Sequence, residues 1–181
     1  WIHEGGISAP LIVHWPSVIK ESRIESEQLH IMDIPATAID VANAKYPDEY
    51  KGNKIKQLEG ESFLDLLVNK WSREKPMYWE HEGNQGIRKG EWKLVKEYDQ
   101  DWELYNLSED RTELNDLSSK EKKRVEEMAI EWEEWAKISN VLPWPVNPNV
   151  LAKRLEGDHA HIHQHRGPTA GQIAEGKGKF L

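Results

Sequence analysis

The sequence contains no cysteine among its 181 residues. Disulfide bonds, thiolate metal sites and a cysteine nucleophile are therefore excluded from these residues. The sequence also lacks an apolar run close to the roughly 20 residues that a membrane-spanning helix needs. Basic residues are in the minority, with 24 Lys and Arg against 32 Asp and Glu and a net charge of −8. Because nucleic acids and anionic membranes attract basic surfaces, this balance argues against both as partners.

The chain begins at Trp1 without a methionine, and we expect it to begin inside an element of a longer polypeptide. An apolar run over residues 7–15 is bounded by Gly5-Gly6 and by Pro16. Its length and its β-branched residues predict a buried strand. We expect the two glycines to let the chain turn sharply before it enters that strand.

A polar surface loop over residues 17–29 separates this strand from a predicted short helix. Apolar residues from position 31 to 41 have helical spacing. Asp33 is expected to cap the helix, with Pro35 in its first turn. A strand, a loop and a helix in this order predict that residues 1–44 close an α/β unit.

Residues 45–74 are expected to connect two layers, with one short amphipathic helix in residues 60–70. Residues 75–140 then predict a separate subdomain. The tail over residues 141–181 is rich in Pro, His and Gly, and no packed structure is predicted for it.

Three extended runs precede a helix in the predicted subdomain. They cover residues 76–83, 85–98 and 101–107. Lys89-Gly90 predicts a tight turn within the middle run, and alternation around it predicts an antiparallel sheet with one face in water. Ser118 and Glu121 form a capping box, which predicts a helix over residues 119–138 that covers the sheet. The nine tryptophans are interpreted mainly as core residues, with a sugar-stacking platform as the less favoured alternative.

Three residues are candidates for substrate binding: His81, Asn84 and His3. His81 could donate a hydrogen bond to a sugar hydroxyl, or Glu80 or Glu82 could hold it across a turn; neither alternative is preferred. His3 could line a pocket rim, but a ring packed beneath a strand entry is favoured.

Other polar residues are interpreted mainly as structural. Glu4 is expected to anchor its turn by accepting backbone N–H bonds. Arg88 is expected to pair with a carboxylate of the same sheet, with Asp110 or Glu113 as candidates. Four alternating histidines of the tail could share a strand face and bind a transition metal, although a flexible polar tail is favoured. They are His159, His161, His163 and His165.

Seven short motifs follow one another along the chain. They are Glu4-Gly5-Gly6; Pro10-Leu11-Ile12-Val13 with Trp15-Pro16; Asp33-Ile34-Pro35-Ala36-Thr37; Gly60-Glu61-Ser62; Trp79-Glu80-His81-Glu82-Gly83-Asn84; Ile87-Arg88-Lys89-Gly90-Glu91-Trp92-Lys93-Leu94; and Glu103-Leu104-Tyr105-Asn106-Leu107 with Asp110, Glu113 and Asn115. In this order, over residues 1 to about 145, they resemble the C-terminal portion of a type I, arylsulfatase-like sulfatase of the alkaline phosphatase superfamily.

The resemblance implies an α/β fold, in which this chain supplies the end of the large catalytic domain and a small subdomain of antiparallel sheet packed by a long helix. It also implies a formylglycine nucleophile and a bound calcium ion. The Cys/Ser-x-Pro-x-Arg motif of the formylglycine is absent, because Ile12 stands where the pattern Ser8-Ala9-Pro10 requires arginine. No catalytic or metal-binding residue is therefore assigned within these residues, and the nucleophile, the active-site lysine and the calcium ligands are expected upstream of Trp1.

The expected function is hydrolysis of a sulfate ester, aryl or carbohydrate, by the complete polypeptide, with this chain inactive alone. The expected partners are a sulfated small molecule or glycan and the upstream part of the same polypeptide. Family resemblance alone implies a periplasmic or secreted location. Two alternatives stay open: a phosphodiester or phosphonate hydrolase of the same superfamily, and a non-catalytic glycan-binding module.

Overall fold

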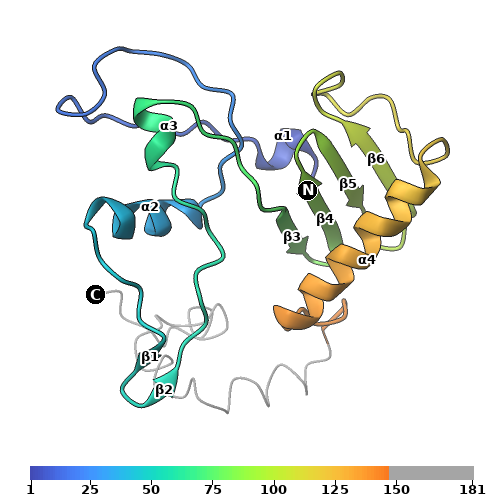
Figure 1. Ribbon diagram of the computed structural model, residues 1–181. Helices are drawn as coiled ribbons and strands as arrows, with labels where there is room; N and C mark the ends of the chain where they lie inside the picture. Colours follow the sequence, from blue (N-terminus) through green and yellow to red (C-terminus); the bar gives the residue numbers. More distant parts are fainter. Residues whose placement is uncertain (147–181) are drawn as a thin grey trace, which may run out of the picture. The chain divides into compact units, whose positions relative to one another are not determined.

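Four consecutive strands form an antiparallel sheet in the order β3-β4-β5-β6 (Figure 1). The computed structural model describes residues 1–146. The strands are β3 (Met77–His81), β4 (Asn84–Lys89), β5 (Trp92–Lys96) and β6 (Trp102–Asn106). Gly90 has a φ of 60° in the turn that divides the middle run, so three extended runs become four strands. The predicted antiparallel sheet is confirmed.

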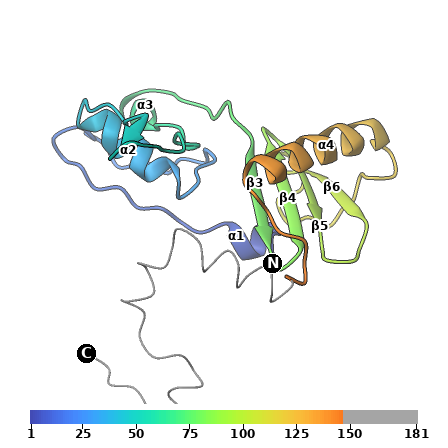
Figure 2. The same ribbon diagram turned by 90° about the horizontal axis from the view of Figure 1, so that it is seen from below.

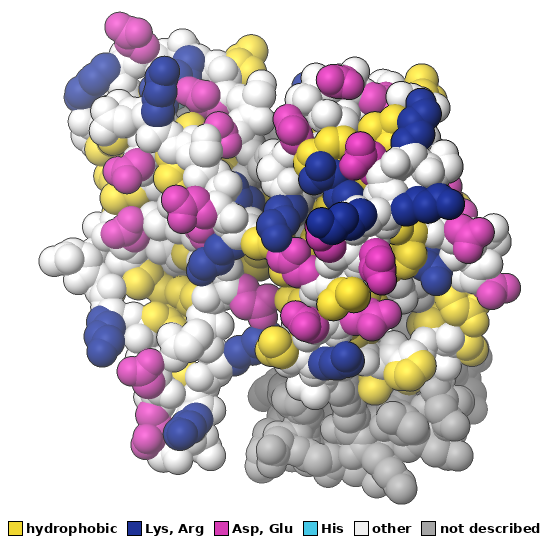
Figure 3. Space-filling model, turned by 45° about the vertical axis from the view of Figure 1, so that its right-hand side comes forward, with side chains coloured by type: hydrophobic (Ala, Val, Ile, Leu, Met, Phe, Trp, Pro, Cys, Tyr) yellow, Lys and Arg dark blue, Asp and Glu magenta, His cyan; other side chains and the backbone are white. Residues whose placement is uncertain are grey.

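Helix α4 (Lys122–Ile138) packs across one face of this sheet (Figure 1). The core between them contains Ile87, Leu94 and Leu104 from three strands, and Met128 and Trp132 from the helix. The predicted covering helix is confirmed, although it begins three residues later than expected. Figure 3 shows that acidic and basic side chains lie side by side over the outer surface on this side of the molecule.

The predicted capping box at the start of α4 is wrong. No side chain caps the helix, whose N-cap residue is Glu121. The hydroxyl and the backbone N–H of Ser118 both donate to the Asp116 carboxylate instead, each at 2.8 Å. Ser118 therefore donates to Asp116 rather than to the first turn of the helix. The Asp116 carboxylate also accepts the Leu104 backbone N–H, which attaches the loop before α4 to β6.

Large aromatic rings fill the space between α4 and the sheet. The Trp132 indole N–H donates to the Trp79 carbonyl oxygen at 3.0 Å. Its ring contacts Trp102 and Trp135, and Tyr78 stacks on Trp135 with centroids 5.0 Å apart. These contacts place the tryptophans of this region in the core, as the favoured interpretation expects.

The other face of the sheet is covered by the first residues of the chain. Ile2 packs with Val95, Tyr105 and Leu107 in a second buried cluster. The short helix α1 (Glu4–Ile7) follows, and the two views in Figures 1 and 2 place α1 and α4 on opposite faces. The expectation of one face in water is therefore wrong, because the N-terminal segment covers that face.

Two further helices pack around a buried polar centre. They are α2 (Asp33–Val41) and α3 (Leu64–Val68), and a small hairpin of β1 (Glu49–Tyr50) and β2 (Asn53–Lys54) lies between them in sequence. The fully buried Asp33 carboxylate accepts the backbone N–H groups of His30 and Glu61 and pairs with Arg73. Met32, not Asp33, is the N-cap residue, so the aspartate joins segments rather than capping the helix.

The predicted strand over residues 7–15 is absent. Ile7 ends α1, and residues 8–15 form neither a helix nor a strand. Within residues 1–146, the backbone of residues 10–14 has no ladder partner, and Ile12 is 90% exposed. The apolar pattern is that of a buried strand, but a strand requires a neighbour in a sheet.

None of the helices in residues 1–146 is both long enough and apolar enough to cross a membrane. Residues 1–141 form one unit. The four alternating histidines from His159 to His165, for which metal binding is the less favoured alternative, lie outside the described residues.

Candidate functional site

His81 and Asn84 lie on either side of the tight turn between β3 and β4, where they are directly paired. The Asn84 amide donates to the His81 carbonyl oxygen at 2.8 Å and accepts the Tyr98 N–H at 3.1 Å. Both ends of this amide therefore stabilise the local backbone. The His81 ring is exposed and has no side-chain partner among the described residues, so it is the one of the pair that is available to a ligand.

The proposed pairing of His81 with a neighbouring glutamate is not found. The Glu80 carboxylate accepts the Gly83 N–H at 2.9 Å instead. Glu82 and Gly83 have φ values of 51° and 82°, which is typical of a two-residue hairpin turn. Glu80 thus stabilises the turn and leaves the histidine unoccupied.

His3 is held against the other edge of the sheet. Its Nε2 lies 3.0 Å from Glu103 Oε2, and the same oxygen accepts the Tyr105 hydroxyl at 2.7 Å. Burial, with the Glu103 charge and hydrogen bond in support, raises the pKa of Tyr105 above its usual range. Tyr105 therefore stays a hydrogen-bond donor at physiological pH and keeps Glu103 in place for the histidine.

The three predicted substrate-binding residues share one face of the sheet but do not form one site. Paired residues of an antiparallel sheet point to the same side. The register places His81 and Asn84 on the same face as Glu103. His3, however, contacts β6, whereas His81 lies on β3 at the opposite edge.

A buried charged cluster, which the sequence pattern did not indicate, lies on this same face. Lys93 is fully buried in β5, and its Nζ lies 2.9 Å from Glu4 Oε1 and 2.8 Å from Glu113 Oε1. Arg88 approaches Glu4 Oε1 at 3.5 Å. Burial lowers the pKa of Arg88, and the nearby Glu4 charge opposes that shift. We call Lys93, Glu4, Glu113 and Arg88 the Lys93 cluster.

Two expectations about this cluster are corrected. Glu4 accepts from the Lys93 and Arg88 side chains, not from backbone amides, and its own N–H donates to Glu113 Oε2 at 2.6 Å. Arg88 pairs with Glu4 rather than with Asp110 or Glu113. Asp110 instead accepts the amides of its own loop, and these hydrogen bonds lower its pKa.

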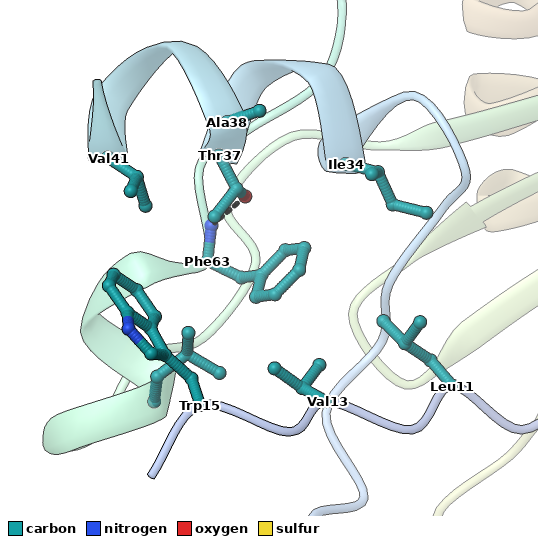
Figure 4. A pocket seen from close by; sticks show the side chains of 9 residues that line it. Leu11, Val13, Trp15, Ile34, Thr37, Ala38, Val41 and Phe63 are labelled. Carbon is teal, nitrogen blue, oxygen red and sulfur yellow. Dashed lines mark hydrogen bonds between the residues drawn. The ribbon is translucent and has the colours of Figure 1, made fainter. Parts of the chain in front are cut away.

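An apolar pocket of about 400 Å³ lies between residues 11–15, α2 and α3 (Figure 4). Leu11, Val13 and Trp15 line it from the unpaired segment, and Phe63 lines it from the start of α3. Its lining is almost wholly hydrocarbon, so it offers no group for acid–base or metal chemistry. Among residues 1–146, no group of three or more His, Asp or Glu side chains could hold a metal ion.

Comparison with known proteins identifies the chain's family. The model of the N-sulphoglucosamine sulphohydrolase C-terminal family matches residues 1–137. The chain belongs to this family. The resemblance to the C-terminal portion of a type I sulfatase is therefore confirmed.

Two similar proteins are named sulfatases. An uncharacterized sulfatase of Schizosaccharomyces pombe is 32% identical over 144 residues, which cover 73% of this chain and 25% of that protein. A sulfatase of Formosa agariphila is 28% identical over 133 residues, covering 64% of this chain and 23% of that protein. The chain thus spans about a quarter of the length of these relatives.

The fold of the sulfatase C-terminal portion is confirmed by a solved structure. The crystal structure of Ps i-CgsB matches with a TM-score of 0.50 and 25% identity, and the match covers 61% of this chain and 25% of that one. The small antiparallel sheet with its covering helix agrees with the C-terminal portion of an α/β sulfatase fold.

Proposed function

We propose that this chain is the C-terminal part of a sulfatase, which as a complete polypeptide hydrolyses sulfate esters. The observation that carries this proposal is the family match, which extends over residues 1–137. The chain spans about a quarter of the relatives that it matches, so catalysis is assigned to the complete polypeptide and not to these residues alone.

The unpaired apolar segment supports this division of labour. Leu11 and Val13 point into the pocket (Figure 4), while Ile12, between them, is 90% exposed. A segment that is apolar on both sides has the composition of a strand that is covered on both faces of a parallel sheet. We propose that the catalytic domain of the same polypeptide supplies the neighbouring strands.

We also propose that the formylglycine and the calcium ion belong to that catalytic domain. The described residues offer no matching ligand set, and the sequence has no Cys/Ser-x-Pro-x-Arg motif. We propose that this chain contributes residues at the rim of the catalytic pocket. We also propose that the complete polypeptide is exported to the periplasm or the medium.

The proposed substrate class is a sulfated carbohydrate, with aryl sulfates as small surrogates. The matching family is named for a sulphohydrolase of N-sulphoglucosamine, and a similar protein of Formosa agariphila is named an ulvan-active sulfatase; it is 32% identical over 36% of this chain. His81 has an exposed ring with no side-chain partner among the described residues, so we propose that it hydrogen-bonds to a sugar hydroxyl.

The test is sulfate release by the complete polypeptide, whose nucleophile is checked by mass spectrometry for conversion to formylglycine. We expect hydrolysis of 4-nitrophenyl sulfate and of sulfated mono- and oligosaccharides. Chelation should abolish it and added calcium should restore it. Hydrolysis of bis(4-nitrophenyl) phosphate or a phosphonate ester without sulfate release would refute the proposal in favour of phosphoryl chemistry. Glycan binding without any hydrolysis by a converted enzyme would refute it in favour of a binding module.

The role of His81 has its own test. His81→Ala should raise KM for the sulfated oligosaccharide several-fold and leave KM for 4-nitrophenyl sulfate unchanged, because only the former extends to the rim. Lys123→Ala is the matched control, since Lys123 is 90% exposed on α4, across the sheet. Equal KM values for His81→Ala and the control would remove His81 from the site.

A further inference from the structure

The Lys93 cluster contains a lysine side chain that is completely buried. Lys93 lies in the middle of β5 with no exposed surface. An ammonium group buried without partners is very costly, and it persists only where carboxylates compensate it. In this cluster Glu4 and Glu113 do so at 2.9 and 2.8 Å.

The cluster joins three segments that are far apart in the sequence. Glu4 belongs to α1, Lys93 to β5, and Glu113 to the loop that follows β6. Glu113 holds Lys93 with one oxygen and the Glu4 N–H with the other, at 2.6 Å. The first turn of α1 is therefore fixed at its backbone and at its side chain together.

The charges of the cluster balance, and Lys93 is central to that balance. Two cations, Lys93 and Arg88, face two carboxylates, Glu4 and Glu113. Glu113 is only 3% exposed and Glu4 only 12%. Removal of the lysine would leave the two buried carboxylates facing each other without the cation that lies between them, and Arg88, which approaches Glu4 at 3.5 Å, would be left to balance both charges. Such an arrangement repels α1 from the sheet.

Resting on the proposed function, we propose that Lys93 is a positioning residue for the sulfatase. It clamps α1 to the C-terminal sheet, and so sets the place of the neighbouring His3, whose Nε2 lies 3.0 Å from Glu103 Oε2. It acts through Glu4 and Glu113 and touches no substrate. The C-terminal subdomain thereby controls turnover through the position of residues 3–6.

The first test measures the clamp in the complete polypeptide without any enzyme assay. In Lys93→Met, hydrogen exchange should accelerate at least tenfold at the Gly6 and Ser8 amides, which are bonded within the α1 turn. The amides of β4 and β5 should keep their protection. Lys89→Met is the matched control, because Lys89 is half-exposed and pairs with Glu131 of α4. Unchanged exchange at Gly6 and Ser8 would overturn the clamp.

Two further variants keep the test decisive if Lys93→Met does not fold. Glu4→Gln leaves the Lys93–Glu113 pair intact and should loosen the same amides to a smaller degree. Glu113→Gln combined with Lys93→Met removes one of the opposed carboxylates and should restore part of the protection. If Glu4→Gln exchanged like the wild type, or if the second substitution brought no recovery, the electrostatic clamp would be refuted.

The second test asks whether the clamp matters for turnover. In the complete enzyme, Glu4→Gln should lower kcat for 4-nitrophenyl sulfate at least fivefold with little change in KM, at a temperature where the variant is fully folded. A loss of stability without a change in kcat would overturn the positioning role. If the wild-type enzyme released no sulfate, the proposed function and the positioning role would both fall, while the exchange experiment would still decide the clamp itself.

Discussion

Gly86 provides the sharpest test of how the N-terminal segment covers the sheet. It lies in β4, and a Cβ built on it would lie 2.5 Å from Ile2 Cγ2, with Trp79 and Val95 each at 3.7 Å. Atoms that close cannot both stay in place. Gly86→Ala therefore forces the buried Ile2 side chain away from the sheet, or distorts the strand.

The size of the effect follows from two opposing contributions. Overpacking a core by one methyl group costs about 1–3 kcal/mol, while alanine gains about 0.5–1 kcal/mol over glycine within a strand. We expect Gly86→Ala to destabilise the chain by up to about 2.5 kcal/mol. Ile2→Ala alone removes the buried side chain at a cost of about 2–5 kcal/mol. In the double variant the new methyl group fills part of that space, so the two changes should couple by at least about 1 kcal/mol.

Urea unfolding followed by tryptophan fluorescence measures this cycle, because Trp79 packs against the same cluster. Gly5→Ala is the control, since a Cβ there meets no atom within 4 Å and alanine favours the helix. It should be neutral or stabilising. Additivity of Gly86→Ala and Ile2→Ala within about 0.3–0.5 kcal/mol would refute the contact between the two residues.

Three other changes probe the rest of the fold. Gly60→Ala should destabilise more than Gly86→Ala, because its Cβ would overlap the Met32 carbonyl, a backbone group that cannot turn aside; thermal melting measures this. Trp132→Phe should cost about 1–3 kcal/mol in urea unfolding, because it leaves the partly buried Trp79 carbonyl without its indole donor. His30→Gln should flatten the loss of stability that the wild type shows as pH falls below about 6.5.

The sign of the His30 effect follows from its surroundings. Burial chiefly lowers the pKa of His30, against the opposing charge of Asp33, and its Nδ1 accepts the Met32 N–H at 3.3 Å. The unfolded chain therefore takes up the proton first as pH falls, and stability declines from about pH 6.5 downward through the lower, folded pKa. Equal slopes for wild type and His30→Gln in chemical unfolding between about pH 7 and about pH 5 would contradict this account.

The sheet and α4 could be predicted because their signals are local. Each of these signals spans only a few residues. They are the alternation in the strands, the turn at Lys89-Gly90 and the helical spacing of Val125, Met128 and Trp132. The cap of α4 could not, because Ser118 has the right spacing for a capping box but finds Asp116 two residues away. Sequence spacing identifies a candidate donor, and local competition decides its acceptor.

Residues 8–15 show a different limit. Their apolar pattern is correct for a strand, yet strand formation depends on a neighbouring backbone that the described residues do not supply. The pattern therefore predicts that Leu11 to Val13 require a neighbouring strand, and not that these residues supply one. Without a neighbouring strand, their side chains stay exposed to solvent, and Leu11 and Val13 line an apolar pocket.

Lys93 was missed for the opposite reason: its pattern looked ordinary. In the run Trp92-Lys93-Leu94-Val95, alternation places the lysine opposite the core and so, for a two-layer subdomain, in water. That inference fails because Ile2 and Glu4 cover the second face of the sheet. The Lys93 side chain then lies between the sheet and this N-terminal layer, where Glu4 supplies a carboxylate partner. Its partner Glu4 is 89 residues away, beyond any periodicity argument. A buried ion pair of this kind can be identified only when the N-terminal segment has been placed against the sheet. The residues that hold this segment in position are therefore the ones that sequence reasoning is least able to find.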